Sequence, residues 1–344
     1  MRCYVGSVNL IDSVTRCHSP FVVQDRASGR VTTLNNTADC AALIARAPLR
    51  YVLSDDLTRL CADLSYSKGA GTVTCADLLH APAETLWVEW CNAPWSHALQ
   101  RYGFPLVAAE AQWVGRRGAW IRSSRDGRRG LVRTFWDAPA QEVLASSVEA
   151  YFDFDTPPDG APQPLDGRPG RAGTVIDSAR ARDDILGRCF RFRYEQSWAQ
   201  YYAAAGLTRE VSGALWRHAV GTIAMDVPML LTFFLLLATR NGLPQRLETF
   251  ARLNRQRLQG GKPPLRDHIE VHAPLLPAYQ DSLRGEPGTT RVSPRLHHVR
   301  GHLVRRGSQI FWRVPHLRGS ARAGLVRMRT VTWTFDGASA GRPH

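Results

Sequence analysis

The chain has 344 residues, of which 44% are hydrophobic, so it can bury a sizeable core and is not typical of a disordered protein. Its 44 lysine and arginine residues outnumber 30 aspartate and glutamate residues, which gives a formal net charge of +14. A basic surplus of this size favours an anionic partner, and nucleic acid is the first class to consider.

The basic surplus is concentrated near the C-terminus. Residues 1–150 carry a net charge of +2, whereas residues 287–344 contain 11 arginines and a single acidic residue, Asp336. A GC-rich genome would explain the preference for arginine over lysine, but it does not explain why carboxylates disappear after Glu286. The segment is therefore either a functional polyanion surface, which we expect, or a merely solvated basic tail.

The seven cysteines are scattered and form no C-x-x-C pair, and the first residues, MRCYVGSVNLIDS, contain no apolar signal core. Free thiols without metal-type spacing are typical of a reducing compartment. We therefore expect a cytoplasmic protein with mostly buried cysteines, no metal ion and no cofactor.

One uninterrupted apolar run covers residues 227–238. It has 12 residues, whereas a membrane-spanning helix needs about 20. We expect a buried core helix that Asp226 caps, with Pro228 in its first turn, and no membrane partner.

Residues 1–155 are predicted to form a mixed α/β region. Spacing and turn residues predict, in chain order, helices over 38–49 and 54–66, a strand over 84–91, a hairpin over 116–136 and a half-exposed strand over 149–156. Ser54 is the expected N-cap of the second helix, and Asp126-Gly127 is the expected hairpin turn.

Residues 156–175 are dense in proline, glycine and aspartate, which predicts a flexible loop or linker. It is either a domain boundary or an insertion within one domain. Residues 176–286 are predicted to be a helical core, because helical spacing runs from Asp177 to about Gly260, with a short strand following over 269–273.

Residues 287–344 are predicted to form a basic β module. Its strand-like runs cover 296–306, 309–314 and 325–335, and Gly307-Ser308 predicts a tight hairpin between the first two. The expected fold class is therefore α+β, with a mixed N-terminal part, a helical core and a C-terminal antiparallel β module.

This β module is the expected nucleic-acid interface. Alternation along its first run places His298, Arg300, His302 and Arg306 on one face. Guanidinium groups pair with phosphates, and aromatic rings such as Trp312 or Phe311 can stack on bases. The predicted nucleic-acid-binding residues are Arg295, His298, Arg300, His302, Arg305, Arg306, Trp312, Arg313, Arg318, Arg327 and Arg329.

Catalysis at the same residues is an alternative function. His298 and His302 could act as general acid and base on a phosphate ester, with Arg300 stabilising the developing charge, as in a metal-independent nuclease. The spacing does not demand this chemistry. Asp153 and Asp155, with Glu149 nearby, could bind Mg²⁺, but alternating acids on a solvated edge strand are commoner.

The stretch LNRQRLQGGKPPL, residues 253–265, lacks the spacing of a phosphate-binding loop. It predicts a helix that ends at Gly260-Gly261. Basic side chains on and beyond this helix would widen the polyanion surface; they are Arg252, Arg255, Arg257 and Lys262.

This stretch, followed by SPRLHHVRGHLVRR and IFWRVPHLRG (293–319), resembles a group of uncharacterised bacteriophage and prophage proteins. In that group, an LN..R...GK.PL stretch precedes a closing basic module. The resemblance covers about 70 residues and implies a cytoplasmic, phage-derived protein, but no catalytic residue is implied. A phage-encoded inhibitor that binds an acidic host protein is therefore a third possible function.

Overall fold

The computed structural model describes the chain in several stretches that are separated by gaps. They are residues 9–15, 21–24, 31–34, 38–66, 76–101, 115–137, 143–155, 189–195, 198–199, 209–239, 243–274, 295–299, 302–307, 309–313, 316–318 and 320–325. The chain forms two compact units, one of Met1–Ala273 with Arg305–Phe311 and one of Pro274–Val304 with Trp312–His344. Helices combine with a large mixed sheet, so the expected α+β class is confirmed.

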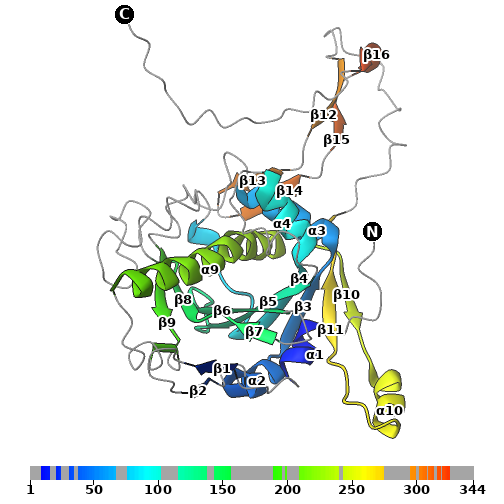
Figure 1. Ribbon diagram of the computed structural model, residues 1–344. Coiled ribbons are helices and arrows are strands. Elements are labelled where there is room, and N and C mark those ends of the chain that lie inside the picture. Colours follow the sequence, from blue (N-terminus) through cyan, green and yellow to red (C-terminus); the bar gives the residue numbers. More distant parts are fainter. Residues whose placement is uncertain are drawn as a thin grey trace, which may run out of the picture. The chain divides into compact units, whose positions relative to one another are not determined.

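The first unit is built on a sheet of nine strands in the order β10-β11-β3-β4-β5-β6-β8-β9, with β7 paired to β6 (Figure 1). Strands β11, β3 and β4 run parallel, and the other pairs are antiparallel. The bounds are β3 (Leu49–Leu53), β4 (Thr85–Cys91), β5 (Arg116–Ser123), β6 (Arg129–Asp137), β7 (Val143–Ala145), β8 (Val148–Asp153), β9 (Phe190–Tyr194), β10 (Gln245–Glu248) and β11 (His268–Val271).

Helices cover both faces of this sheet (Figure 1). On one face, Leu10 and Ile44 join Trp87 and Phe135 in a buried cluster. On the other face, Tyr51 contacts Phe233 edge to face, with ring centroids 5.5 Å apart. The first face carries α1 (Leu10–Val14) and α2 (Ala38–Ala45); the second carries α3 (Asp55–Tyr66), α4 (Asn92–Arg101) and α9 (Arg209–Leu237). A separate hairpin pairs β1 (Phe21–Gln24) with β2 (Val31–Leu34).

Several local predictions are confirmed. The hydroxyl of Ser54 accepts a hydrogen bond from the backbone N–H of Leu57 (3.3 Å), as an N-cap does. The hairpin β5–β6 turns at Gly127, whose φ is +71°. Strand β8 alternates between buried and half-exposed residues, and α10 (Ala251–Gln259) ends at Gly260 with Gly261 at φ +66°.

The prediction that Asp226 caps the apolar helix is wrong. Helix α9 begins at Arg209 and continues through Asp226 and Pro228, because buried apolar residues such as Val220 and Ile223 extend its packed face upstream. Within the described ranges, one segment, Gly213–Leu237, is long and apolar enough to cross a membrane, and 78% of its most apolar window is buried inside the molecule.

Two stretches inside the predicted helical core are strands. In β9, Phe190 and Phe192 are buried while Arg191 and Arg193 alternate with them, and this period of two overrides the helical spacing. Strand β10 pairs antiparallel with β11 at the edge of the sheet. The sheet, with helices on both faces, is therefore the centre of this unit.

The C-terminal segment has two small sheets. A three-stranded sheet has the order β15-β12-β16, formed by β12 (Arg295–Val299), β15 (His316–Arg318) and β16 (Ser320–Leu325). A hairpin of β13 (His302–Arg306) and β14 (Gln309–Arg313) confirms the predicted turn, where Gly307 has φ +60°. Strand β12 runs parallel to β16, so the module is not purely antiparallel.

The predicted strand over 296–306 is two strands that belong to different sheets. Except for Leu325, the predicted strand over 325–335 lies outside the described residues. The predicted linker over 156–175 also lies outside them. Cys61, Cys91 and Cys189 are buried and form no disulfide with another described residue. Burial raises the pKa of the Cys61 thiol.

We predict that Gly127→Ala destabilises the protein more than Gly261→Ala. Both glycines have a positive φ, but a methyl group at Gly127 would lie 2.8 Å from the backbone nitrogen of Ala81, whereas Gly261 has open space. The strain common to both should cost about 1 kcal/mol, and the clash should add roughly 2 kcal/mol at Gly127. Urea unfolding of the two variants measures the difference; equal losses would contradict the steric argument.

Candidate nucleic-acid interface

The residues predicted to bind nucleic acid are spread over two sheets. By element they are Arg295 and His298 on β12, His302, Arg305 and Arg306 on β13, Trp312 and Arg313 on β14, and Arg318 on β15, while Arg300, Arg327 and Arg329 lie outside the described residues. The predicted row from His298 to Arg306 is therefore divided between β12 and β13. The hairpin β13–β14 carries the candidates whose side-chain surroundings are described.

This hairpin has a buried face and an exposed face. Along β14, Ile310 and Trp312 are 4% and 3% exposed, whereas Gln309 and Arg313 are exposed and Phe311 is half-exposed. Trp312 therefore packs inside the molecule. Of the two aromatic residues considered for stacking on a base, Phe311 has the accessible ring.

The exposed face combines guanidinium groups with an aromatic ring. The guanidinium carbon of Arg306 lies 6.0 Å from the ring centroid of Phe311, at the outer limit of a cation–π contact. Arg313 follows Phe311 at the next exposed position of β14. Arg306 and Arg313 are both exposed, and neither forms an ion pair with any residue that the structure describes.

Arg305, unlike the neighbouring Arg306, forms an ion pair with a described residue. Its two terminal nitrogens donate to both carboxylate oxygens of Asp77 (2.8 and 2.7 Å), and its Nε donates to the carbonyl of Gly307 (3.0 Å). Asp77 lies in the short 3-10 helix Ala76–Leu78 of the same unit. This fork-like pair anchors the hairpin turn and occupies the guanidinium that a phosphate would need.

The residues of the catalytic alternative are divided between two strands and a position outside the described residues. His298 and His302 belong to strands of different sheets, and Arg300 lies outside the described residues. Among the residues described, no three His, Cys, Asp or Glu side chains lie together as metal ligands would.

The acids considered for Mg²⁺ are paired with arginines. Arg128 Nε donates to Asp155 (2.6 Å), and Arg129 lies 3.3 Å from Asp153 and from Asp155. Glu149 accepts a hydrogen bond from the hydroxyl of Tyr151 (2.9 Å). The alternating acids therefore belong to a charge network on the sheet.

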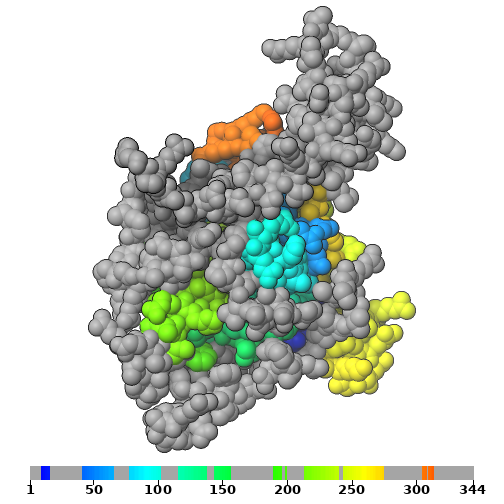
Figure 2. Space-filling view, turned by 45° about the horizontal axis from the view of Figure 1, so that its top comes forward, coloured from blue at the N-terminus to red at the C-terminus, as the bar shows by residue number. Residues whose placement is uncertain are grey.

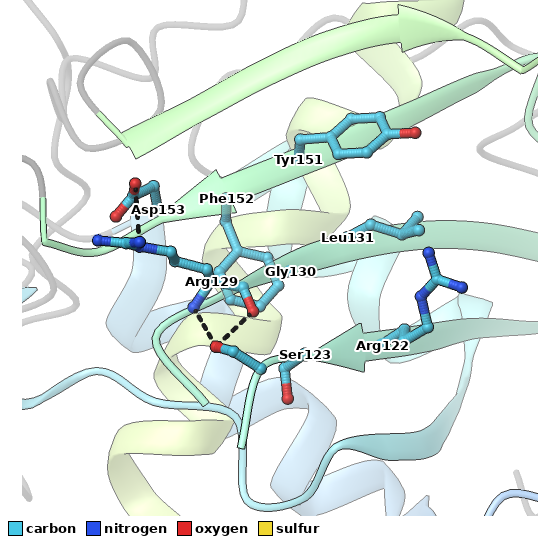
Figure 3. A pocket seen from close by; sticks show the side chains of 9 residues that line it. Arg122, Ser123, Arg129, Gly130, Leu131, Tyr151, Phe152 and Asp153 are labelled. Carbon is cyan, nitrogen blue, oxygen red and sulfur yellow. Dashed lines mark hydrogen bonds and ion pairs between the residues drawn. The ribbon is translucent and has the colours of Figure 1, made fainter. Parts of the chain in front are cut away.

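A pocket of about 460 Å³ opens beside this network (Figure 3). Its lining residues are Arg122, Ser123, Ser124, Arg129, Gly130, Leu131, Tyr151, Phe152 and Asp153. Arg122 is exposed and has no ion-pair partner within the described ranges, whereas Arg129 pairs with Asp153. Burial raises the pKa of Tyr151, so its hydroxyl stays protonated. The lining offers one available cation and no nucleophile beside a base, which is too little to define a reaction.

A buried ionic cluster lies under α1 on the first face of the sheet. Glu89 is fully buried and accepts hydrogen bonds from the backbone of Leu10 (2.8 Å), the backbone of Ile11 (3.1 Å) and the indole of Trp87 (3.1 Å). It also pairs with the guanidinium of Arg116. The cluster attaches α1 to β4 and β5, and the only sequence signal for it is a charged residue within the apolar strand LWVEW.

Asp137 lies at the edge of this cluster. Its carboxylate accepts a hydrogen bond from the backbone N–H of Arg116 (3.1 Å). Burial, with a smaller contribution from Glu89, raises the pKa of Asp137 to about 6. Compared with the unfolded chain, the folded protein therefore keeps this carboxyl group protonated up to a higher pH.

Comparisons with known proteins give no assignment: no protein-family model matches the chain, and no curated protein or solved structure is significantly similar to it.

We predict that Asp137→Asn stabilises the protein above pH 6 by about 1–2 kcal/mol. Because the pKa of Asp137 is about 6 in the folded state and about 4 when unfolded, the folded protein binds the extra proton between these values. Stability is therefore lost as the pH rises through this range, and asparagine removes the loss while keeping an oxygen for the Arg116 N–H.

Urea unfolding at pH 4 and pH 7.5 measures this difference. Asp126→Asn is the matched control, because hydrogen bonds from Ser124 and the Arg128 backbone lower the pKa of the exposed Asp126, so that variant should lose stability above pH 4. If the stability of wild type and of Asp137→Asn changed in parallel with pH, the raised pKa of Asp137 would be contradicted.

Proposed function

We propose that the protein binds nucleic acid through the exposed face of the β13–β14 hairpin and the arginine-rich C-terminal segment to which this hairpin belongs. The observation that carries the proposal is the grouping of Arg306, Phe311 and Arg313 on one accessible face. This face belongs to a 58-residue segment that contains 11 arginines and one acidic residue. The setting proposed is that of a cytoplasmic, phage-type protein.

The chemistry of this face suits a phosphate backbone with accessible bases. Arginine pairs with phosphate oxygens in a fork-like geometry, and an aromatic ring can stack on an unpaired base. Binding should be largely electrostatic, because each phosphate contact releases condensed counterions. Affinity should therefore fall steeply as the salt concentration rises.

We predict that Arg306→Ala with Arg313→Ala weakens binding to all nucleic-acid sequences and lowers the salt slope by about 1.5–2. Arg59→Ala with Arg125→Ala is the matched control, because it removes the same formal charge from two exposed positions outside the hairpin. The measurement is binding of purified, nuclease-treated protein to labelled single-stranded and double-stranded DNA and RNA across a salt series. Unchanged affinity in a folded hairpin variant would contradict the proposal.

The same binding experiments distinguish the proposed function from its two alternatives, a phosphate-ester hydrolase and an inhibitor of an acidic host protein. If the protein cleaves the labelled nucleic acid without divalent ions, and His302→Ala abolishes this cleavage, the protein is a phosphate-ester hydrolase and the proposal is wrong. An acidic protein that binds the hairpin, together with no nucleic-acid binding at low salt, would favour the alternative function, inhibition of an acidic host protein.

We also predict that Asp77→Asn strengthens nucleic-acid binding several-fold at low salt and raises the salt slope by about 1. Asparagine no longer neutralises Arg305, whose guanidinium becomes available for a phosphate. Asp56→Asn removes an equivalent exposed charge that pairs only weakly with Arg59 (3.4 Å) and serves as the control. Equal gains in the two variants would show that Arg305 takes no part in binding.

A further inference from the structure

An arm projects from the edge of the nine-stranded sheet. The chain between strands β10 and β11 carries α10 (Figure 1), and the space-filling view shows this yellow segment standing out from the body (Figure 2). No residue of α10 is buried. Burial of an apolar face therefore does not stabilise α10, so other interactions must hold it in place. Its exposed side chains are accessible to a binding partner.

Hydrogen bonds to the segment that follows the helix, residues 263–267, hold α10 in place. The side chain of Asn254 accepts from the backbone of Leu265 (2.7 Å) and donates to its carbonyl (2.9 Å). Arg257 donates to the carbonyl of Pro263 (2.9 Å), and Asp267 accepts from the backbone of Phe250 (2.8 Å). These bonds fix one side of α10 against its own loop and leave the opposite side open.

The open side carries arginine and glutamine. Arg252, Arg255, Gln256 and Gln259 are all exposed, and their spacings of three, four and seven residues place them on one helix face. Between positions 249 and 266 the chain has five basic residues and no acid. The acids that bound the arm are engaged: Glu248 pairs with Arg246, and Asp267 caps the backbone of Phe250.

From this surface we infer that α10 enters the major groove of duplex DNA. An α-helix is about 10–12 Å across, and the B-form major groove is about 12 Å wide, so the exposed face fits within it. Arginine recognises phosphates and guanine, and glutamine recognises adenine. The inference rests on the proposed nucleic-acid function and deepens it, because it names duplex DNA as the target.

Other surfaces fit this face less well. The major groove of A-form RNA is deep and narrow, so side chains on a helix cannot reach its bases, and single strands offer no groove. An anionic membrane would require one continuous apolar face. The exposed leucines of α10, Leu253 and Leu258, are five residues apart and lie on opposite flanks of the arginine and glutamine face.

The test compares three probes of one sequence: duplex DNA, duplex RNA and single-stranded DNA. We expect Arg252→Ala with Arg255→Ala to weaken duplex-DNA binding about tenfold and to lower its salt slope, while binding to the other probes changes no more than in Arg59→Ala with Arg125→Ala. Gln256→Ala with Gln259→Ala should weaken duplex-DNA binding without changing the salt slope. Alanine preserves helix formation in both arm variants.

The outcomes separate the arm from the hairpin. If the arm variant binds duplex DNA as the charge-matched control does, while the hairpin variant loses binding, the groove assignment is overturned and the proposed function stands. An equal loss on all three probes also overturns it, because the arm would then act as a non-specific charged surface. If wild type binds none of the probes at low salt, the proposed function fails and the inference fails with it.

Discussion

A buried ion pair between Arg117 and Asp226 constrains how helix α9 packs on the sheet of the first unit. Both side chains are almost inaccessible, and Arg117 Nη1 lies 3.2 Å from Asp226 Oδ2. The same guanidinium donates to Asn92 (2.8 Å) and lies 4.1 Å from the ring centroid of Trp95. Removing one partner from a buried pair costs about 3–5 kcal/mol, because it leaves the other charge uncompensated. The pair therefore holds the apolar helix α9 against the centre of the sheet.

Two consecutive arginines of β5 extend this constraint to both faces of the sheet. Arg117 binds Asp226 of α9 on one face, and Arg116 binds Glu89, which accepts the first backbone N–H groups of α1, on the other. Neighbouring residues of a strand point to opposite faces, so this arginine pair connects both helical layers through one strand. The same sheet continues through β4, β3 and β11 to β10, and it supports the arm that carries α10.

Local sequence patterns were sufficient for the elements that depend on local chemistry. The hairpin at Gly127, the N-cap at Ser54 and the alternation in β8 follow from turn residues and periodicity. Burial of Asp226 within α9 could not be predicted, because the arginine that neutralises it comes from a strand 109 residues earlier. A hydropathy pattern alone treats such a charge as the end of a helix.

In the candidate interface, too, contacts between residues far apart in the sequence could not be predicted. The Gly307 turn and the basic character of the hairpin follow from the sequence, but the pairing of Arg305 with Asp77 joins residues 228 positions apart. Alternation also does not say which face of β14 is buried, and the structure buries Trp312 while leaving Phe311 accessible. Similarly, the C-cap of α10 was predictable, whereas the absence of buried residues in this helix was not.

Two surfaces of different character result: a hairpin with Arg306, Phe311 and Arg313, and a helix with an arginine and glutamine face. Hydrogen–deuterium exchange of the full chain, with and without duplex DNA, tests most directly whether they bind nucleic acid. Slower exchange confined to peptides covering α10 and the β13–β14 hairpin is the predicted result. Protection that is absent, or that appears instead around the Arg122 pocket, would contradict the claim that these two surfaces form the interface.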